Sequence, residues 1–228
     1  MFISNAGKKL GDFSLEIEKL EIPGSGMYGI IGPNGSGKST LAKLMAGLIP
    51  LNSGTIDTEG LTFRDITYIP RKPYIMDNTV YNNLMYPLRL RKQQPDPELI
   101  AGYLAKMGFS ERQKQKAKSL SSGEQQKLAF LRAIIFKPRF IIADEAMTAM
   151  DIDSLDTFEN MLLEEQRKEN STWIIISHQM PHIRRLCAHT FFMYQGRIEA
   201  EGKTEDIFSR ELNPHLRQYL RAYGGENQ

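Results

Sequence analysis

The organising segment of this chain reads Gly32-Pro33-Asn34-Gly35-Ser36-Gly37-Lys38-Ser39-Thr40. Glycines followed by Lys and Ser match the pattern of a phosphate-binding loop. Because glycine has no side chain, backbone N–H groups can converge there on phosphate oxygens. We expect Lys38 to contact the β- and γ-phosphates of a nucleoside triphosphate, and Ser39 to ligate Mg²⁺. The alternative is a glycine-rich turn with a purely structural role. The loop alone does not indicate which class of nucleotide-using protein this chain belongs to.

The sequence on both sides of the loop predicts the strand and the helix that such a loop needs. Met27–Ile31 is a short apolar run typical of a strand, whereas Leu41, Leu44, Met45 and Leu48 recur at helical spacing. The helix would begin at the phosphates, where its N-terminal dipole favours negative charge. This context favours phosphate binding over a structural turn.

A second apolar run ends in two acids, Asp144 and Glu145. We expect Asp144 to hold the Mg²⁺ shell and Glu145 to polarise the attacking water as a general base. His178 follows another predicted strand, Trp173–Ser177, and would face the same crevice if the strands are parallel. A histidine that merely ends a strand is the alternative for His178.

The remaining periodicity predicts strands that alternate with helices. Apolar runs predict strands at Phe13–Ile17, Ile66–Ile69, Phe140–Ala143 and Thr190–Tyr194, the last continuing through a hairpin into Arg197–Glu201. Helical spacing predicts helices over Asn78–Arg89 and Pro95–Met107, after Ser122 as N-cap, and from Asp153 or Ser154 to just before Asn170.

This alternation favours an α/β fold of the P-loop NTPase type, with a mainly parallel sheet and an N-terminal antiparallel β portion. We expect one domain, in which 72–136 forms an inserted helical lobe. Residues 1–71 and 137–228 would then form the nucleotide-binding core lobe.

Composition limits the partners and the compartment. The net charge of +2 over 228 residues argues against nucleic acid as the main partner. No apolar run approaches the roughly 18–20 residues that cross a bilayer. Met1–Leu10 lacks the apolar stretch of a signal peptide, and the single cysteine, Cys187, suits a reducing compartment. We therefore expect a cytosolic chain whose membrane role, if any, runs through a partner.

A further motif, Leu120-Ser121-Ser122-Gly123-Glu124-Gln125-Gln126, precedes the acidic strand by about twenty residues. It resembles the signature motif of the ABC ATPase family. With the loop at 32–40, the acidic pair at 144–145, Asp151 in the D-loop position and His178 in the H-loop position, the resemblance covers nearly the whole chain. Five motifs stand in the family's order and spacing.

The resemblance implies a dimer. Two subunits would pack head to tail, so that each ATP lies between one loop and the other subunit's signature segment. A second helix N-terminus and further backbone donors would then close on the γ-phosphate. The nucleotide-binding positions implied on that side are Ser121, Ser122, Gly123, Glu124 and Asp151.

The resemblance also implies an ATPase, with Lys38, Glu145 and His178 as catalytic residues and with ATP and Mg²⁺ bound. Its partners would be a second ATPase subunit, most simply an identical copy, transmembrane permease subunits and a solute-binding protein. The chain would lie peripherally on the cytoplasmic face of the inner membrane. Import is favoured because importers commonly keep the ATPase as a separate chain, and the overall pattern is similar to ATPases of small-anion importers for tungstate or molybdate. Two alternatives stay open: a soluble ABC protein outside transport, and a degenerate scaffold subunit with weak turnover.

Arg71 is the largest departure from the family pattern, because the Q-loop position usually holds glutamine. A cation beside Mg²⁺ would be repelled, but Arg71 could contact the γ-phosphate instead. In the signature, Ser122 stands where a glycine is usual and Glu124 where glutamine is common. Both changes leave hydroxyl groups and backbone donors available to a phosphate.

Two aromatic features have open interpretations. Phe13 is the nearest aromatic to the place where the family stacks adenine, close to Leu10, but it could equally be a core residue. Pro73, Tyr74, Ile75, Met76 and Tyr86 could line a groove that receives a permease helix, although a core would use the same residues.

Overall fold

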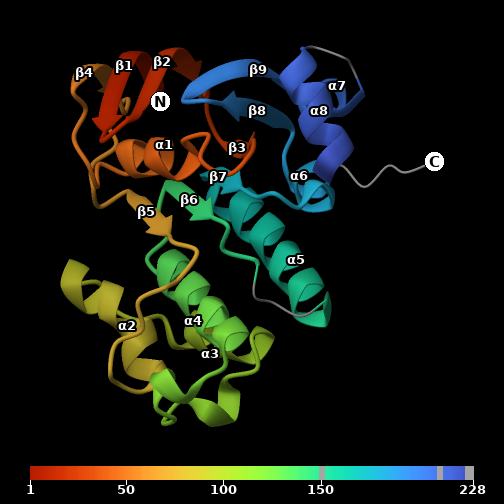
Figure 1. The fold of residues 1–228 in the computed structure, drawn as a ribbon. Coiled ribbons are helices and arrows are strands. Elements are labelled where there is room, and N and C mark those ends of the chain that lie inside the picture. The colour runs from red at the N-terminus through yellow and green to blue at the C-terminus, as the bar shows by residue number, and fades with distance from the viewer. Residues whose placement is uncertain (149–151, 210–212, 224–228) are drawn as a thin grey trace.

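The computed structural model describes residues 1–148, 152–209 and 213–223 (Figure 1). Within them, a three-stranded antiparallel sheet has the order β2-β1-β4, and a six-stranded sheet has the order β5-β6-β7-β3-β8-β9. The strands of the first sheet are β1 (Phe2–Leu10), β2 (Phe13–Glu21) and β4 (Ser53–Asp57). Those of the second are β3 (Gly26–Ile31), β5 (Ile66–Ile69), β6 (Phe140–Asp144), β7 (Thr172–Ile176), β8 (His189–Tyr194) and β9 (Arg197–Lys203). Neighbouring strands from β5 to β8 are parallel, and β9 returns antiparallel to β8.

The helices divide between the sheets and a separate helical region. They are α1 (Lys38–Met45), α2 (Val80–Arg91), α3 (Pro97–Lys106), α4 (Ser122–Ile134), α5 (Ile152–Glu169), α6 (Met180–Leu186), α7 (Thr204–Ser209) and α8 (Pro214–Tyr223). Short 3-10 turns at Ser110–Arg112 and Ala117–Ser119 join α3 to α4. Figure 1 shows α1 between the two sheets, whereas α2, α3 and α4 gather beyond the far edge of the six-stranded sheet. The predicted α/β fold with a mainly parallel sheet is confirmed.

Alternation along the central strands explains the layers. In β6, Phe140 and Ile142 face the cluster shared with α1 and the antiparallel sheet, whereas Ile141 and Ala143 face the cluster shared with α4 and α5. Because successive side chains of a strand point to opposite faces, a continuous apolar run must be covered on both sides. The second cluster continues without interruption into α2 and α3. The predicted division at residues 72 and 136 therefore stays a prediction, since one apolar core crosses both positions.

Several predicted boundaries move. Helix α1 ends at Met45, and Gly47 at φ +67° terminates it, so Leu48 lies outside the helix and is exposed. Ser121, one residue before the predicted Ser122, caps α4. Helix α5 begins at Ile152, ahead of the predicted start.

Other local predictions are confirmed. Asn170 adopts φ +48° directly after α5, as a residue that ends a helix often does. Gln195 and Gly196 both have positive φ and make the tight turn between β8 and β9. Within the described ranges, no helix combines the length and apolarity that crossing a bilayer requires.

Candidate functional site

The glycine-rich loop lies where β3 ends and α1 begins, and its backbone requires glycine at two positions. Gly32 adopts φ +146°, and a Cβ there would lie 2.1 Å from the carbonyl oxygen of Met193. Gly37 adopts φ +104°, and a Cβ there would lie 2.9 Å from Phe13 Cζ. Positive φ and the close approach of β8 and β2 therefore both disfavour a side chain at Gly32 and Gly37.

Lys38 closes this loop from within. Its side chain is buried, and Nζ donates to the carbonyl oxygens of Gly32 at 2.7 Å and Pro33 at 2.9 Å. Burial lowers the pKa of Lys38, while the nearby carboxylates of Glu145 and Asp144 act in the opposite direction. The ammonium group is thus held at the loop between backbone acceptors and two acids.

The first turn of α1 supplies further donors. The N–H groups of Lys38, Ser39 and Thr40 have no acceptor within the helix, because the first turn of any helix lacks one. Ser39 is exposed and Thr40 is half-buried. The buried hydroxyl of Ser36 finds no hydrogen-bond partner in the described structure. This donor set fits a phosphate chain.

Asp144 ends β6 and is held by a tyrosine that is not among the predicted site residues. The hydroxyl of Tyr68 in β5 donates to Asp144 Oδ2 at 2.7 Å. The pKa of Tyr68 is raised, mainly by burial and then by this hydrogen bond. Tyr68 pairs with Ile142 across β5 and β6, two residues before Asp144. The sequence feature that could have predicted this contact is a tyrosine near the end of β5, the strand beside the one that ends in Asp144.

Glu145 has a special backbone and two basic neighbours. It adopts φ +50°, a left-handed conformation that is uncommon for a residue with a side chain, while its N–H donates to Ile176 of β7. Its Oε1 lies 3.8 Å from His178 Nδ1, and its Oε2 lies 3.2 Å from Arg71 Nη1. The structure thus brings Glu145, His178 and Arg71 together, and Arg71 contacts the predicted base.

The backbone of Arg71 is tied to the signature helix. Gln126 of α4 is buried, and its Nε2 donates to the carbonyl oxygen of Arg71 at 3.0 Å. Gln126 belongs to the signature motif, but no separate role is predicted for it from the sequence. Its buried position on α4 follows from the helical spacing with Phe130, which packs against Phe158 and Trp173.

The signature segment begins α4 at the end of the helical region that lies away from α1 (Figure 1). Ser121 accepts a hydrogen bond from the Glu124 N–H, and Glu124 Oε2 accepts one from the Ser121 N–H at 2.8 Å. Ser121 and Ser122 are exposed, whereas Gly123 is half-buried. Within one chain, the structure therefore does not bring these residues to the glycine-rich loop.

The negative charge of Glu124 is paired. Arg112, from the 3-10 turn before α4, bonds to Glu124 Oε1. This contact and the capping bonds to Ser121 lower the pKa of Glu124 to about 2, with Arg112 as the largest cause. A fixed anion at the start of α4 is thereby compensated by a fixed cation.

The other predicted positions have mixed outcomes. Phe13 is half-buried beside Gly37, which places an aromatic ring next to the loop, whereas Leu10 is exposed. Asp151 lies outside the described residues. The missed residue Tyr219 of α8 is buried against Phe192, and burial raises its pKa to about 12, with the backbone amide of Gly32 acting in the opposite direction. Tyr219 lies far from Gly32 in the sequence, and no sequence pattern predicts that the two residues are close.

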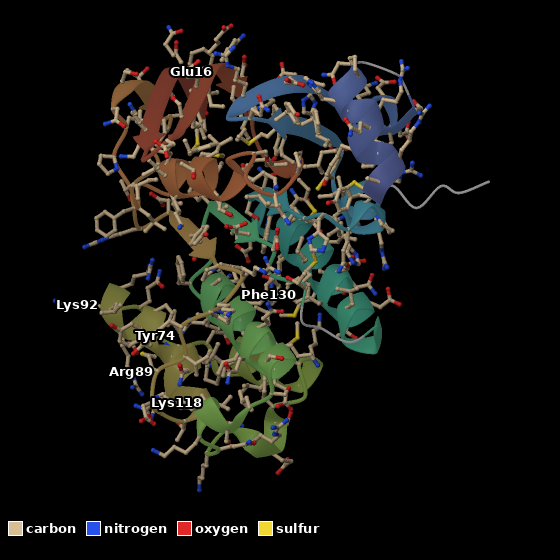
Figure 2. The ribbon with its side chains drawn as sticks, viewed as in Figure 1. Glu16, Tyr74, Arg89, Lys92, Lys118 and Phe130 are labelled. Atoms are coloured by element: carbon tan, nitrogen blue, oxygen red, sulfur yellow. The ribbon has the colours of Figure 1, made fainter. Side chains whose placement is uncertain are left out.

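A groove of about 380 Å³ lies between β5, α2 and α4. None of the described residues that line it is acidic, and both Arg91 and Arg132 reach it. Ile75, predicted for such a groove, is instead buried in the core. Figure 2 shows Tyr74 on the same side of the helical region as Arg89, Lys92 and Lys118. The predicted groove residues that do line it are Tyr74, Met76 and Tyr86.

A metal ion would depend on few protein ligands. Among the described residues, no three His, Cys, Asp or Glu side chains cluster to hold an ion. The hydroxyl of Ser39 and the carboxylate of Asp144 are oxygen groups of the kind that Mg²⁺ prefers, and Mg²⁺ beside phosphates usually takes only one or two protein ligands and several waters. The residues present therefore fit Mg²⁺ bound together with a nucleotide.

Comparison with known proteins gives one consistent result. The profile of the family described as ABC transporter matches residues 15–148. The tungstate uptake system ATP-binding protein TupC of Peptoclostridium acidaminophilum is 34% identical over 208 residues, which cover 88% of this chain and 97% of that protein. The methionine import ATP-binding protein MetN of Chlamydia pneumoniae is 29% identical over 231 residues, 92% of this chain and 67% of that protein. A solved ATP-binding subunit of an ABC transporter has the same fold, with a TM-score of 0.85 at 20% identity over 98% of both chains.

Proposed function

The chain belongs to the ABC transporter family as an ATP-binding subunit with ATPase activity, and we propose that it powers import by closing as a dimer around ATP. One observation supports the proposal that ATP is bound and hydrolysed at this site. The loop lysine, the acid pair and His178 converge at the carboxyl ends of parallel strands, where ligands bind in open α/β sheets. Each of them comes from a different segment of the sequence.

In the proposed reaction each residue has a separate task. The loop amides and Lys38 bind the phosphates, and Ser39 with Asp144 holds Mg²⁺, which would neutralise charge on the β- and γ-phosphates. Glu145 takes a proton from the attacking water. His178, whose Nδ1 lies 3.8 Å from Glu145 Oε1, positions that water. Phe13 contacts the adenine from its place beside Gly37.

We propose a head-to-tail dimer because the signature helix starts away from the loop of its own chain. The exposed Ser121 and Ser122 offer hydroxyl groups, and the N-terminus of α4 offers backbone donors, to a phosphate held by a second copy. Pairing of Glu124 with Arg112 reduces the repulsion that a carboxylate would otherwise exert there. Asp151 follows the acid pair closely enough in sequence to take part at the same interface.

The permease partner would dock in the groove between β5, α2 and α4. Its apolar aromatic lining and two arginines suit a short amphipathic helix of a transmembrane subunit, and it lies beside the strand that leads to Arg71. Because the groove lies next to the Q-loop position, a permease helix bound there could change the position of Arg71 through only a few intervening residues. The chain would accordingly lie on the cytoplasmic face of the inner membrane, and a solute-binding protein on the opposite side would capture the solute.

For the transported solute we propose an oxyanion such as tungstate or molybdate. The support is the 34% identity with the tungstate uptake protein over nearly its full length, compared with 29% for the methionine importer. Recognition of the solute would belong to the permease and the solute-binding protein, since this chain supplies the energy.

The test uses the chain with its permease in proteoliposomes, with the solute-binding protein outside. Tungstate should stimulate ATP hydrolysis and accumulate, methionine should do neither, and Glu145→Gln should abolish both effects of tungstate. Arg64→Gln, an exposed charge change in the turn before β5, serves as the control and should leave both intact. Wild-type hydrolysis no faster than that of Glu145→Gln would instead support a degenerate scaffold. Hydrolysis without any bound permease partner would support a soluble role outside transport.

A further inference from the structure

The ion pair between Arg71 and Glu145 joins an exposed cation to a largely buried anion. The Arg71 side chain is 65% exposed, whereas that of Glu145 is 10% exposed, and 3.2 Å separates Nη1 from Oε2. No described donor completes a hydrogen bond to Glu145 Oε2. The long side chain of Arg71 can therefore leave this oxygen at little steric cost, while Glu145 is held by its backbone bond to Ile176.

A guanidinium in this position has two competing anions. It contacts the carboxylate of Glu145 here, and the same carboxylate lies near Lys38, which marks the phosphate end of the loop. Phosphate offers a guanidinium paired oxygens and more negative charge than a carboxylate, so a terminal phosphate at Lys38 competes strongly for Arg71. A diphosphate ends one group short and does not compete in the same way.

We propose that Arg71 is a latch on Glu145 that the γ-phosphate opens. In the nucleotide-free chain Arg71 occupies Glu145 Oε2, and with a triphosphate bound it transfers to the γ-phosphate and leaves that oxygen free to accept the proton of water. Arg71 thus acts as a positioning residue that distinguishes ATP from ADP. The inference rests on the proposed roles of Glu145 and the loop.

The latch also responds to the helical region. Because Gln126 of α4 binds the backbone of Arg71, a shift of the signature helix moves the root of the Arg71 side chain. When a second copy or a permease displaces α4, the latch therefore shifts together with it. Opening the latch before the site closes would waste ATP, and this connection ties the two events together.

The first measurement follows the Nε–H resonance of Arg71 in ¹⁵N-labelled full-length chain, assigned by its loss in Arg71→Lys. Glu145→Gln should move this resonance in the nucleotide-free chain, because the charged partner is gone. Magnesium with the non-hydrolysable analogue adenylyl imidodiphosphate should also move it, whereas magnesium with ADP should not. A resonance that ignores Glu145→Gln, or that responds equally to both nucleotides, would overturn the latch.

The second measurement is the ratio of the dissociation constants of ADP and the same analogue, by calorimetry. Arg71→Gln should lower the preference for the triphosphate about fivefold, the size of one charge contact in a partly exposed site, while Arg89→Gln should leave the ratio unchanged. An unchanged ratio in Arg71→Gln contradicts the proposal. Lys38→Ala distinguishes a failure of the proposed binding site from a failure of the latch. Undiminished nucleotide binding by this variant would refute the role of the loop itself, whatever Arg71 does.

Discussion

Tyr68 and Asp144 are joined by a 2.7 Å hydrogen bond that crosses from β5 to β6, with the phenol as donor and the carboxylate as acceptor. The bond fixes one oxygen of a buried acid and leaves the other for a different partner. It also places a residue of the strand before Arg71 in direct contact with the strand before Glu145. Two of the segments that build the site are therefore coupled before any ligand binds.

Tyr68→Phe should weaken the response to magnesium. Without the phenol, Asp144 keeps its charge but loses the bond that orients it, and one such hydrogen bond contributes about 1 kcal/mol. We expect the half-saturating Mg²⁺ concentration for ATP hydrolysis to rise about fivefold, with little change in the affinity for ATP without metal. Tyr74→Phe, which changes an exposed tyrosine, is the control. An identical magnesium titration for Tyr68→Phe would show that the bond does not serve the metal site.

Lys38→Ala should lose nucleotide binding at millimolar ATP. The variant removes a buried ammonium that bonds to two loop carbonyls, so both the phosphate contact and the shape of the loop are affected. Lys43→Ala, on the exposed side of α1, provides a matched loss of one lysine. Binding is measured by calorimetry, and circular dichroism verifies that each variant is folded. ATP affinity equal to that of wild type would remove the loop from the binding site.

Glu145→Gln should accumulate an ATP-bound dimer. The amide cannot accept the proton of water, so ATP stays intact and holds two chains together. Light scattering with ATP and magnesium should report about twice the monomer mass of 26.0 kDa. Adding Ser122→Asp should return the protein to monomer, because a carboxylate would face the γ-phosphate across the interface. A monomeric Glu145→Gln protein under these conditions would contradict the nucleotide sandwich.

Arg112→Gln should destabilise the fold at neutral pH and much less in acid. The pKa of Glu124, about 2, lies below the ordinary value of 4.5, so its stabilising effect is complete above about pH 4.5 and is lost as the pH falls toward 2. We expect a melting temperature about 1–3 °C lower than wild type at pH 7, with the difference shrinking between pH 4.5 and 2. Arg112→Lys should retain most of the effect. A difference that does not depend on pH would show that Arg112 acts through packing instead.

The strand, the glycine-rich loop and the helix at residues 26–45 could be predicted from the sequence because local chemistry dictates them. The loop from Gly32 to Thr40 needs positive φ and close backbone approach, and those demands are visible as glycine in the sequence. The apolar run before Asp144 predicts a buried parallel strand, whose carboxyl end must open toward the crevice. The ABC family was identified once the signature motif at residues 120–126 joined these segments, and the family and its fold are confirmed.

The identity of the motifs can be read from the sequence, because glycine spacing, strand ends and helix caps are properties of neighbouring residues. The contact of Arg71 with Glu145, the bond of Tyr68 to Asp144 and the bond of Gln126 to the Arg71 backbone arise instead from packing. These partners are 55 to 76 positions apart. They meet because β5 pairs with β6 and α4 packs beside them, and no local pattern records which side chains such packing brings within reach.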